Sequence, residues 1–363
     1  MRVVICGGGV IGACTAYFLS QRGIDVIVVE RTEVAAAASG KAGGFLALDW
    51  CAGSPLDALA RRSFELHAAL PGEIMGDWGY RRMTAYSGVV VPERDSRRHL
   101  PARLDWLSEG VVIEAQLSST DTTAIVHPHA FTNAMMNAAR SNGTELRHGR
   151  VTGIVRTADG SIATGVEVDH DLIEADAVVI AMGPWSVMAA AWMVLPAVYG
   201  RRSPSLVYQT GLDLPADALF LEYHQDAGGV LTVEVFPRAN GNTLITAFGD
   251  EPPLPLDPAA VSPEPIEVER LKAIAERISP ALRPDRVIAA QACFRPFTQD
   301  GLPLIGKVPQ IGGAYVATGH SVWGILNAPA TGEVMAELIA DGRARSIDPR
   351  PFDPARLRQS TGR

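Results

Sequence analysis

The first thirty residues carry two apolar runs separated by a segment of helical periodicity. Residues 2–6 form the first run and lead into glycines, residues 10–22 carry the helical pattern, and residues 24–30 form the second run. Gly23 stands where a helix typically ends, because glycine adopts the left-handed backbone conformation without strain. This order predicts a strand–helix–strand unit with parallel strands, which need helices on both faces of their sheet.

The middle of the chain changes to patterns that are typical of antiparallel strands. Asn240-Gly241 lies between two apolar runs and favours a two-residue hairpin turn. The strands of this sheet are predicted over residues 206–209, 219–223, 230–236 and 243–248. Irregular strands are predicted over residues 80–92, and short strands over 150–176 with a turn at 158–160.

Helical periodicity returns at intervals along the chain. Ser262 and Pro263 suit the cap and the first position of a helix that ends at residue 278. A charge-free stretch over 177–199 is interrupted by Gly183-Pro184 and by Pro196, so it predicts a strand, a turn and a short apolar helix instead of a membrane span. Other helices are expected over residues 56–70 and 130–141 and around 334–340, with a stiff surface connection over the proline-rich residues 252–265.

The sequence of elements runs from α/β to β-rich and back to α/β. A length of 363 residues favours two domains at roughly 150 residues each. We therefore expect two domains that are interleaved in the chain. The first takes residues 1–80, 127–198 and 296–345, the second takes 81–126 and 199–295, and a loose or peripheral tail covers 346–363.

Composition narrows the class of protein. The chain is 47% hydrophobic and 20% charged, which is typical of a globular protein. Its net charge of −8 argues against nucleic acid as a partner, since nucleic-acid binders usually carry a basic stripe. The four cysteines lack the spacing of a zinc site, and no secretory signal pattern opens the chain. We expect a cytoplasmic protein with no metal and no membrane insertion.

The glycines between the first strand and the first helix form the most informative motif. Residues 7–12 read Gly-Gly-Gly-Val-Ile-Gly, which is the GxGxxG pattern. Such glycines allow a tight turn, the approach of backbone to a pyrophosphate, and close helix–strand packing. Glu30 follows eighteen residues after Gly12, at the end of the second strand, where a carboxylate accepts hydrogen bonds from ribose hydroxyls. The combination predicts a dinucleotide site.

Further segments distinguish among dinucleotides. They are Ala38-Ser39 with Ala42-Gly43-Gly44, His127-Pro128 before a helix, residues 181–185 (Ala-Met-Gly-Pro-Trp), residues 295–306 from Arg295 to Gly306, and residues 319–325. In this order they resemble the D-amino-acid oxidase superfamily of FAD-dependent amine oxidoreductases, which includes glycine oxidase and monomeric sarcosine oxidase. Residues 39–54 and 320–332 are most similar to a less characterised FAD-dependent oxidoreductase branch of that superfamily.

The resemblance implies a fold and a set of cofactor contacts. The fold is a Rossmann-like α/β domain of glutathione-reductase type that binds FAD, with a mostly antiparallel sheet as the substrate domain. The pyrophosphate would be held by Gly7, Gly9, Val10, Ile11 and Gly12, and a phosphate would also contact Ser39. On the adenosine side, Glu30 would bind the ribose, Arg31 would flank the adenine, and Val151 would contact the adenine. The flavin ring would lie beside Lys41, Ala42, Gly43 and Gly44, with Gly324 and Ile325 at its pyrimidine edge, and Ala181, Gly183, Trp185 and Gly319 would also lie at the cofactor.

Two residues near the end of the second domain bear on covalent attachment and on the substrate. Cys293 aligns with the cysteine through which monomeric sarcosine oxidase attaches its flavin, but a small buried cysteine is the favoured interpretation, so we expect non-covalent FAD. Arg295 occupies the position that binds the substrate carboxylate in the resembling D-amino-acid and glycine oxidases. A planar guanidinium matches a carboxylate in geometry and charge. The alternative is an arginine paired with an acid.

Other candidates surround the predicted substrate position. Trp323 is expected as a pocket wall, and Trp50 and Tyr223 are further wall candidates. His320 is a possible base, although a structural role is favoured because the Gly-His segment of the family acts through its backbone.

The resemblance implies oxidation of a C–N bond in a small amino acid or N-methyl amino acid, with hydride transfer to flavin N5 and O2 as acceptor. The alternatives are a dehydrogenase with another acceptor, a flavin-stabilised interaction or trafficking protein with little turnover, and an NAD-binding protein.

Overall fold

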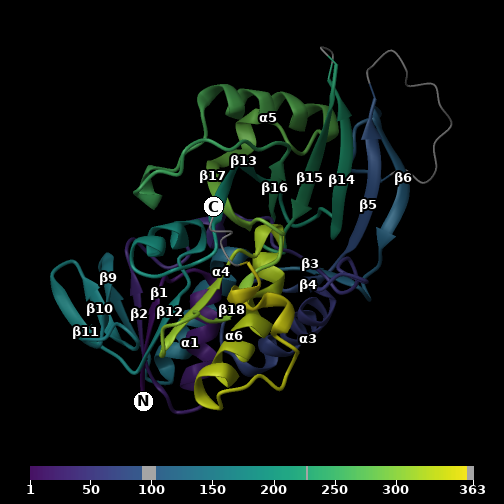
Figure 1. Ribbon diagram of the computed structural model, residues 1–363. Helices are drawn as coiled ribbons and strands as arrows, with labels where there is room; N and C mark the ends of the chain where they lie inside the picture. Colours follow the sequence, from purple (N-terminus) through teal and green to yellow (C-terminus); the bar gives the residue numbers. More distant parts are fainter. Residues whose placement is uncertain (92–103, 226–227, 358–363) are drawn as a thin grey trace.

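Two large sheets organise the computed structural model of the chain, which describes residues 1–91, 104–225 and 228–357. The lower body of Figure 1 contains a six-stranded sheet, and the seven-stranded sheet stands above it. In spatial order the first sheet consists of β18 (Leu304–Lys307), β19 (Ala314–Thr318), β12 (Ala177–Ile180), β1 (Arg2–Cys6), β2 (Asp25–Glu30) and β8 (Glu145–His148). The second consists of β17 (Val287–Thr298), β13 (Val198–Gln209), β16 (Asn242–Thr246), β15 (Val230–Pro237), β14 (Asp217–His224), β5 (Thr84–Val90) and β6 (Val111–Ser118).

The six-stranded sheet is parallel except for the pairing of β18 with β19. Side chains alternate between its faces, so Val3 and Ile5 of β1 pack into one core while Val4 and Cys6 pack into another. The first core lies against helices, as the sequence predicts. These are α1 (Val10–Ser20), α3 (Asp57–Glu73), α4 (Pro128–Ser141) and α6 (Gly324–Ala340).

The other face of this sheet corrects the prediction of helices on both sides. It packs against a three-stranded antiparallel sheet and the 3-10 helix η2 (Gly183–Ala191). Apolar strand residues such as Val166 and Ile173 are buried against this face. The three strands are β9 (Val151–Arg156), β10 (Ala163–Val168) and β11 (Asp171–Glu174). Burial therefore requires an apolar cover, and here a sheet supplies it.

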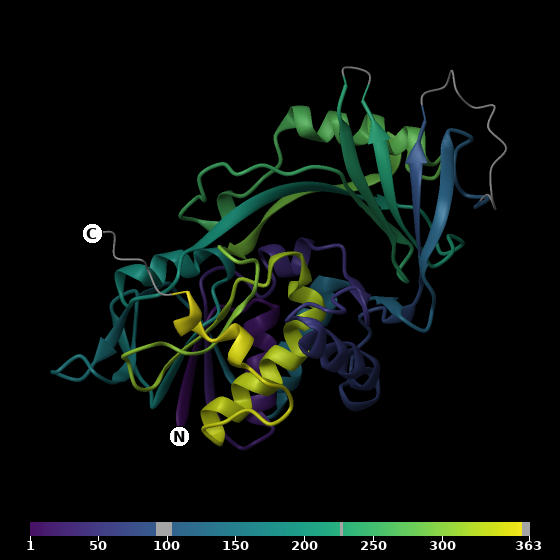
Figure 2. The same ribbon diagram turned by 45° about the vertical axis from the view of Figure 1, so that its right-hand side comes forward.

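The seven-stranded sheet is antiparallel except between β14 and β5. Its apolar face packs on the helix α5 (Pro265–Ile278) through residues such as Leu206, Ile245 and Leu271. The opposite face turns toward the α/β body, and Figure 2 shows the sheet arching over that body. The long strands β13 and β17 connect the two bodies. A fourth, small sheet lies at their junction and consists of β3 (Phe45–Ala47), β7 (Thr123–Ile125) and β4 (Arg81–Arg82).

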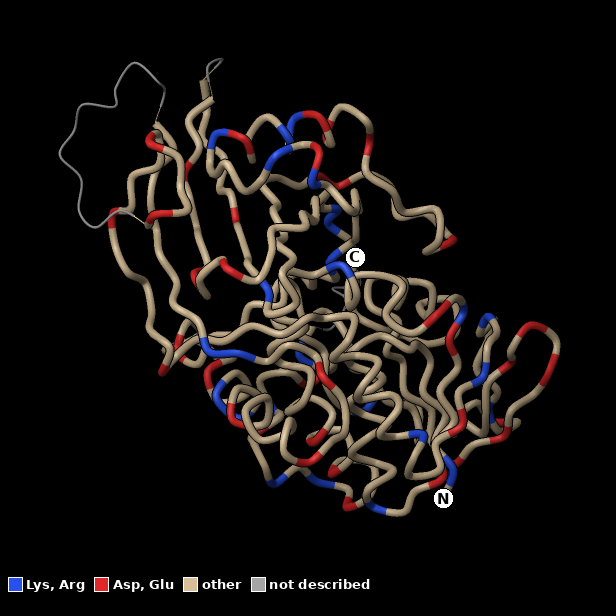
Figure 3. Tube along the Cα trace, turned by 180° about the vertical axis from the view of Figure 1, so that it is seen from behind, with Lys and Arg blue, Asp and Glu red and all other residues tan. Residues whose placement is uncertain are grey.

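The start of α5 differs from the prediction. The helix begins at Pro265, and Glu264 forms its cap with Glu267 in a capping box, with the Glu264 amide donating to Glu267 Oε2 at 2.8 Å. Ser262 therefore does not cap it. The sequence contains a second proline two residues after Pro263, and the glutamate pair satisfies the helix end at that later position. Acidic and basic residues both lie along α5, and Figure 3 shows the two colours at the helix.

Two further segments refine the expectations. After β12 the charge-free stretch continues as the 3-10 helix η2, and none of the described helices is both long and apolar enough to cross a membrane. The tail is not loose over its described part. Phe352 is 1% exposed within the α/β core, and Arg356 pairs with Asp300 at 2.8 Å. Residues 358–363 lie outside the described residues.

Candidate active site

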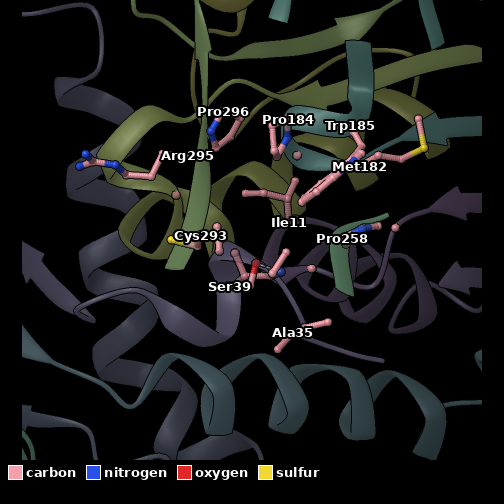
Figure 4. A pocket seen from close by; sticks show the side chains of 18 of the residues that line it. Ile11, Ala35, Ser39, Met182, Pro184, Trp185, Pro258, Cys293, Arg295 and Pro296 are labelled. Carbon is pink, nitrogen blue, oxygen red and sulfur yellow. Dashed lines mark hydrogen bonds between the residues drawn. The ribbon is translucent and has the colours of Figure 1, made fainter. Parts of the chain in front are cut away.

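A cavity lies between the α/β body and the face of the seven-stranded sheet that turns toward it. It holds about 1710 Å³ of space outside protein atoms, part of which opens to solvent. Figure 4 shows Ile11, Ser39, Cys293 and Pro184 around its middle, with Arg295 at the opposite end from Pro258. Most of the predicted site residues line it: Gly7, Gly9, Val10, Ile11, Glu30, Arg31, Ser39, Lys41, Ala42, Gly43, Val151, Ala181, Gly183, Trp185, Cys293, Arg295, His320, Gly324 and Ile325.

The turn between β1 and α1 packs so closely against neighbouring backbone that Gly7 and Gly12 have no room for a side chain. Gly7 has φ +114°, and a Cβ on it would lie 2.5 Å from the Ala181 carbonyl oxygen. A Cβ on Gly12 would lie 2.0 Å from the Gly7 carbonyl oxygen. Gly12 does not line the cavity, so its role is to let the helix begin directly against the turn. The N-cap of α1, Gly9, offers no side-chain acceptor, and the helix N-terminus opens into the cavity. Such a terminus favours an anion.

The side chains of Glu30 and Ser39 accept hydrogen bonds from backbone amides in and beside this turn. Glu30 Oε2 accepts a hydrogen bond from the Gly8 amide at 2.6 Å, and Glu30 Oε1 accepts one from the Thr32 amide at 2.9 Å. Ser39 Oγ accepts from the Val10 amide at 2.9 Å. Glu30 Oε1 also accepts from Thr32 Oγ1 at 3.0 Å, whereas Glu30 Oε2 and the Ser39 hydroxyl retain capacity for a further partner. The carboxylate therefore sits at the end of β2, on the cavity wall, where the sequence places it.

The proline-rich connection lies at the same end of the cavity. Trp185 Nε1 donates to the Pro255 carbonyl oxygen at 2.8 Å, and Arg31 Nη1 donates to the Leu256 carbonyl oxygen at 2.6 Å. Pro258 itself lines the cavity. This segment is thus a wall of the cavity, a role that its composition did not indicate.

Two predicted glycines lie behind the lining. A Cβ on Gly44 would lie 2.0 Å from the Val126 carbonyl oxygen, and one on Gly319 would lie 2.6 Å from Thr298 Cγ2. Both are required for packing between segments next to the cavity.

Arg295 extends from β17 into the cavity without an acidic partner at ion-pair distance among the described residues. Its Nη2 donates to Ser203 Oγ at 2.7 Å, and its Nε is buried with no hydrogen-bond partner. Ser203 belongs to the neighbouring strand β13, opposite Cys293. The alternative of an arginine sealed by an acid therefore loses support, and the guanidinium keeps donors for a ligand.

A row of polar side chains on the same sheet face was not predicted. Gln291 lies opposite Ser205, and Thr246 lies opposite Glu234, so the row crosses β17, β13, β16 and β15. Of these, Ser205, Thr246 and Glu234 line the cavity. They come from four different strands. Only the register between strands brings them together, and a single sequence does not contain that register.

Cys293 lines the cavity between these groups. Burial raises the pKa of its thiol, while the charges of Arg295 and Lys41 act in the opposite direction. Lys41 lies at the end of the short helix α2 (Ala38–Lys41), and its carbonyl oxygen accepts from Gln291 Nε2 at 3.1 Å.

Three predicted wall residues do not line the cavity. Trp50 packs against Phe45 and Phe220, each with ring centroids 4.9 Å apart, and its ring lies 6.5 Å from that of Trp323. This aromatic group stands behind the wall. Tyr223 lies farther along β14, where its hydroxyl accepts from Arg277 Nη1 of α5 at 2.9 Å. Tyr223 therefore contacts α5 and does not line the cavity.

His320 is buried, and its Nε2 lies 3.0 Å from Thr331 Oγ1 of α6. Burial lowers the pKa of His320 to about 3, so the ring is neutral at physiological pH. His67 of α3 is also buried, and burial lowers its pKa to about 4. Its Nε2 lies 2.9 Å from the Ile325 carbonyl oxygen, which has no helical donor because Pro329 lacks an N–H. Both rings therefore support α6.

These histidines predict acid sensitivity. Their pKa values in the folded protein lie below the unfolded value of about 6.5, so the unfolded chain binds more protons between the two. The free energy of unfolding should fall as pH decreases from about 6.5 and stop falling from this cause near pH 3. Urea unfolding of the holoprotein at pH 7, 6, 5 and 4 measures this slope.

The matched variants are His320→Gln and His67→Gln, with the exposed His170→Gln as control. Each of the first two should flatten the slope, and the control should leave it unchanged. A slope that is the same in all four proteins would show that other groups dominate acid unfolding.

Comparisons with known proteins agree with this geometry. A family model described as DAO, FAD dependent oxidoreductase, matches residues 2–338. A Schizosaccharomyces pombe protein named as an oxidoreductase is 29% identical, with 97% of each chain covered. A glycine oxidase of Pseudomonas aeruginosa is 28% identical, with 98% of each chain covered. The crystal structure of glycine oxidase from Bacillus cereus superposes with a TM-score of 0.79 at 25% identity, over 94% of this chain and 98% of that one.

Proposed function

Because the chain belongs to the DAO family of FAD-dependent oxidoreductases, we propose that it oxidises the C–N bond of a small amino acid or N-methyl amino acid. The observation that carries this proposal is the position of Arg295, which lines the cavity and has no acidic partner at ion-pair distance among the described residues. A guanidinium on the sheet side of the cavity, whose hydrogen bond to Ser203 leaves other donors available, suits a substrate with a carboxylate. The glycine oxidases among the relatives act on such a substrate by name. The product is an imine, which water hydrolyses to a keto acid and ammonia or an amine.

The described residues fit the cofactor of the family. The close glycine turn and the open N-terminus of α1 suit the pyrophosphate, with Ser39 beside it. Glu30 stands where it would accept from ribose hydroxyls, and Val151 and Arg31 line the same end. The segment from Lys41 to Gly43 and the start of α6 would border the flavin ring. FAD, when bound, accepts the two electrons that leave the substrate.

The protein's own contribution is to bind and orient the substrate. Arg295 would fix the carboxylate, and Ser203 would hold the guanidinium in place. Leu244 supplies apolar surface that limits water. The positive end of the α6 dipole, at Gly324, would stabilise negative charge at that end of the cavity. His320 is neutral and committed to Thr331, so we assign it to support of α6 instead of proton transfer.

The proposal is tested by anaerobic titration of the purified protein with a panel of D-, L- and N-methyl amino acids. Loss of the oxidised flavin absorbance identifies the substrate and its chirality. If no amino acid bleaches the flavin, the interaction or trafficking alternative gains and the proposed activity is wrong.

Oxygen is the proposed electron acceptor. The reduced protein, once exposed to air, should regain its oxidised spectrum quickly if it is an oxidase. Slow reoxidation in air together with rapid reoxidation by an added quinone would assign it as a dehydrogenase.

A further inference from the structure

Glu234 is the acidic side chain that shares the sheet side of the cavity with Arg295. It lies in the middle of β15, flanked along the strand by the buried residues Val233 and Val235. Its side chain is on the cavity face, and both it and Arg295 line the same space. Burial raises the pKa of the Glu234 carboxyl, and the charge of Arg295 acts in the opposite direction. The two groups therefore influence each other electrostatically.

The two charges are nevertheless not paired. Among the described residues, no basic side chain lies within 4.0 Å of the Glu234 carboxylate and no group donates a hydrogen bond to it. Arg295 instead donates to Ser203. Glu234 is partly buried. A carboxylate that is partly withdrawn from water and has no partner is costly, so a ligand that pairs with it gains binding energy.

Neither neighbouring hydroxyl group hydrogen-bonds to Glu234 among the described residues. Thr246, directly opposite Glu234, donates from Oγ1 to the Pro204 carbonyl oxygen at 2.8 Å. Ser205 Oγ accepts from Gln291 Nε2 at 3.1 Å. On the other side, Glu234 lies opposite Phe220 of β14, which is apolar. The carboxylate is thus left to face the cavity.

We propose that Glu234 binds the ammonium group of the substrate while Arg295 binds its carboxylate, so that the cavity recognises an amino acid as a zwitterion. The inference rests on the proposed function and specifies its substrate class. A cation and an anion held apart on one wall match the two charges of an amino acid. The same arrangement disfavours a dicarboxylate, because its second carboxylate meets Glu234.

The test compares ligands that differ at one group. Glycine and sarcosine carry both charges, glycolate replaces the ammonium with a hydroxyl, and iminodiacetate adds a second carboxylate. Binding is followed in the holoprotein by perturbation of the flavin spectrum, or by anaerobic flavin reduction for ligands that react. The variant Glu234→Gln keeps the shape of the side chain and removes its charge.

In Glu234→Gln, the half-saturating concentration of glycine or sarcosine should rise about 10- to 100-fold, as loss of a charged hydrogen bond predicts. The value for glycolate should stay the same or fall, since a neighbouring negative charge is removed. Iminodiacetate should bind the variant more tightly than it binds the wild type. Equal weakening of glycine and glycolate would overturn the proposal.

Two measurements keep the test decisive if the variant loses its cofactor. The bound FAD content reports that loss directly. The wild type alone should then prefer sarcosine to iminodiacetate by about tenfold or more, and the reverse preference would overturn the proposal. Failure of the proposed function is separate, because wild-type protein would then respond to no amino acid at all.

Discussion

Replacing Arg295 by methionine should nearly abolish reduction of the flavin by amino acids. The guanidinium lies in the roof of the cavity with a buried Nε that has no partner, and methionine fills similar space without charge. Removing one partner of a desolvated charge pair costs about 2–5 kcal/mol, which corresponds to roughly 30- to 5000-fold in affinity. The measurement is the amino-acid concentration that gives half the maximal rate of anaerobic flavin reduction.

Two variants separate binding from structure. Arg295→Lys retains the charge but not the planar fork and should lie between wild type and Arg295→Met. Ser203→Ala removes one neutral acceptor that orients the guanidinium, and about 1 kcal/mol predicts a change near fivefold. FAD content should be normal in all three. If amines that lack a carboxylate are the only compounds that bleach the flavin, the assignment of Arg295 is wrong.

Gly12→Ala should prevent formation of the cofactor site. The added Cβ would lie 2.0 Å from the Gly7 carbonyl oxygen, and neither backbone segment can move without disturbing β1 or α1. Overpacking of this kind destabilises by about 1–3 kcal/mol, and a displaced turn would also lose hydrogen bonds to the phosphates. Loss of two such bonds at about 1.5–3 kcal/mol each lowers FAD affinity by more than roughly 100-fold. Bound flavin per chain and the thermal unfolding midpoint measure both effects.

Gly72→Ala is the matched control. Gly72 is exposed within α3, and a Cβ there would meet nothing within 4 Å. Alanine is the better helix former, so this variant should unfold at the wild-type temperature or slightly above it. If Gly12→Ala purified yellow with normal flavin content, the close approach of the turn to α1 would not be needed for binding.

Local sequence patterns predicted much of this molecule. The strand–helix–strand unit, its glycines and Glu30 all lie within thirty residues, so spacing alone indicates their arrangement. The resemblance extended the prediction to distant segments, and most of those residues line the cavity. Arg295 was found in this way.

Features that depend on strand register were not predictable. Glu234 interrupts an apolar strand, a position that reads equally well as solvent-facing. Its placement on the cavity face follows from the pairing of β15 with β16, which no local pattern contains. The same reason explains why Tyr223, an aromatic on the same sheet, was placed at the cavity although it contacts α5.

The wide separation of the cavity residues along the chain has a consequence for synthesis. The lining begins at Gly7 and is completed only by Ile325, and β1 meets its partner β12 about 170 residues later in the sequence. At roughly 5–20 residues per second, a nascent chain holds β1 with one edge unpaired for about 10 to 35 seconds. The cavity can therefore be completed only after residue 325 has left the ribosome, and we expect FAD to be captured after that point in synthesis.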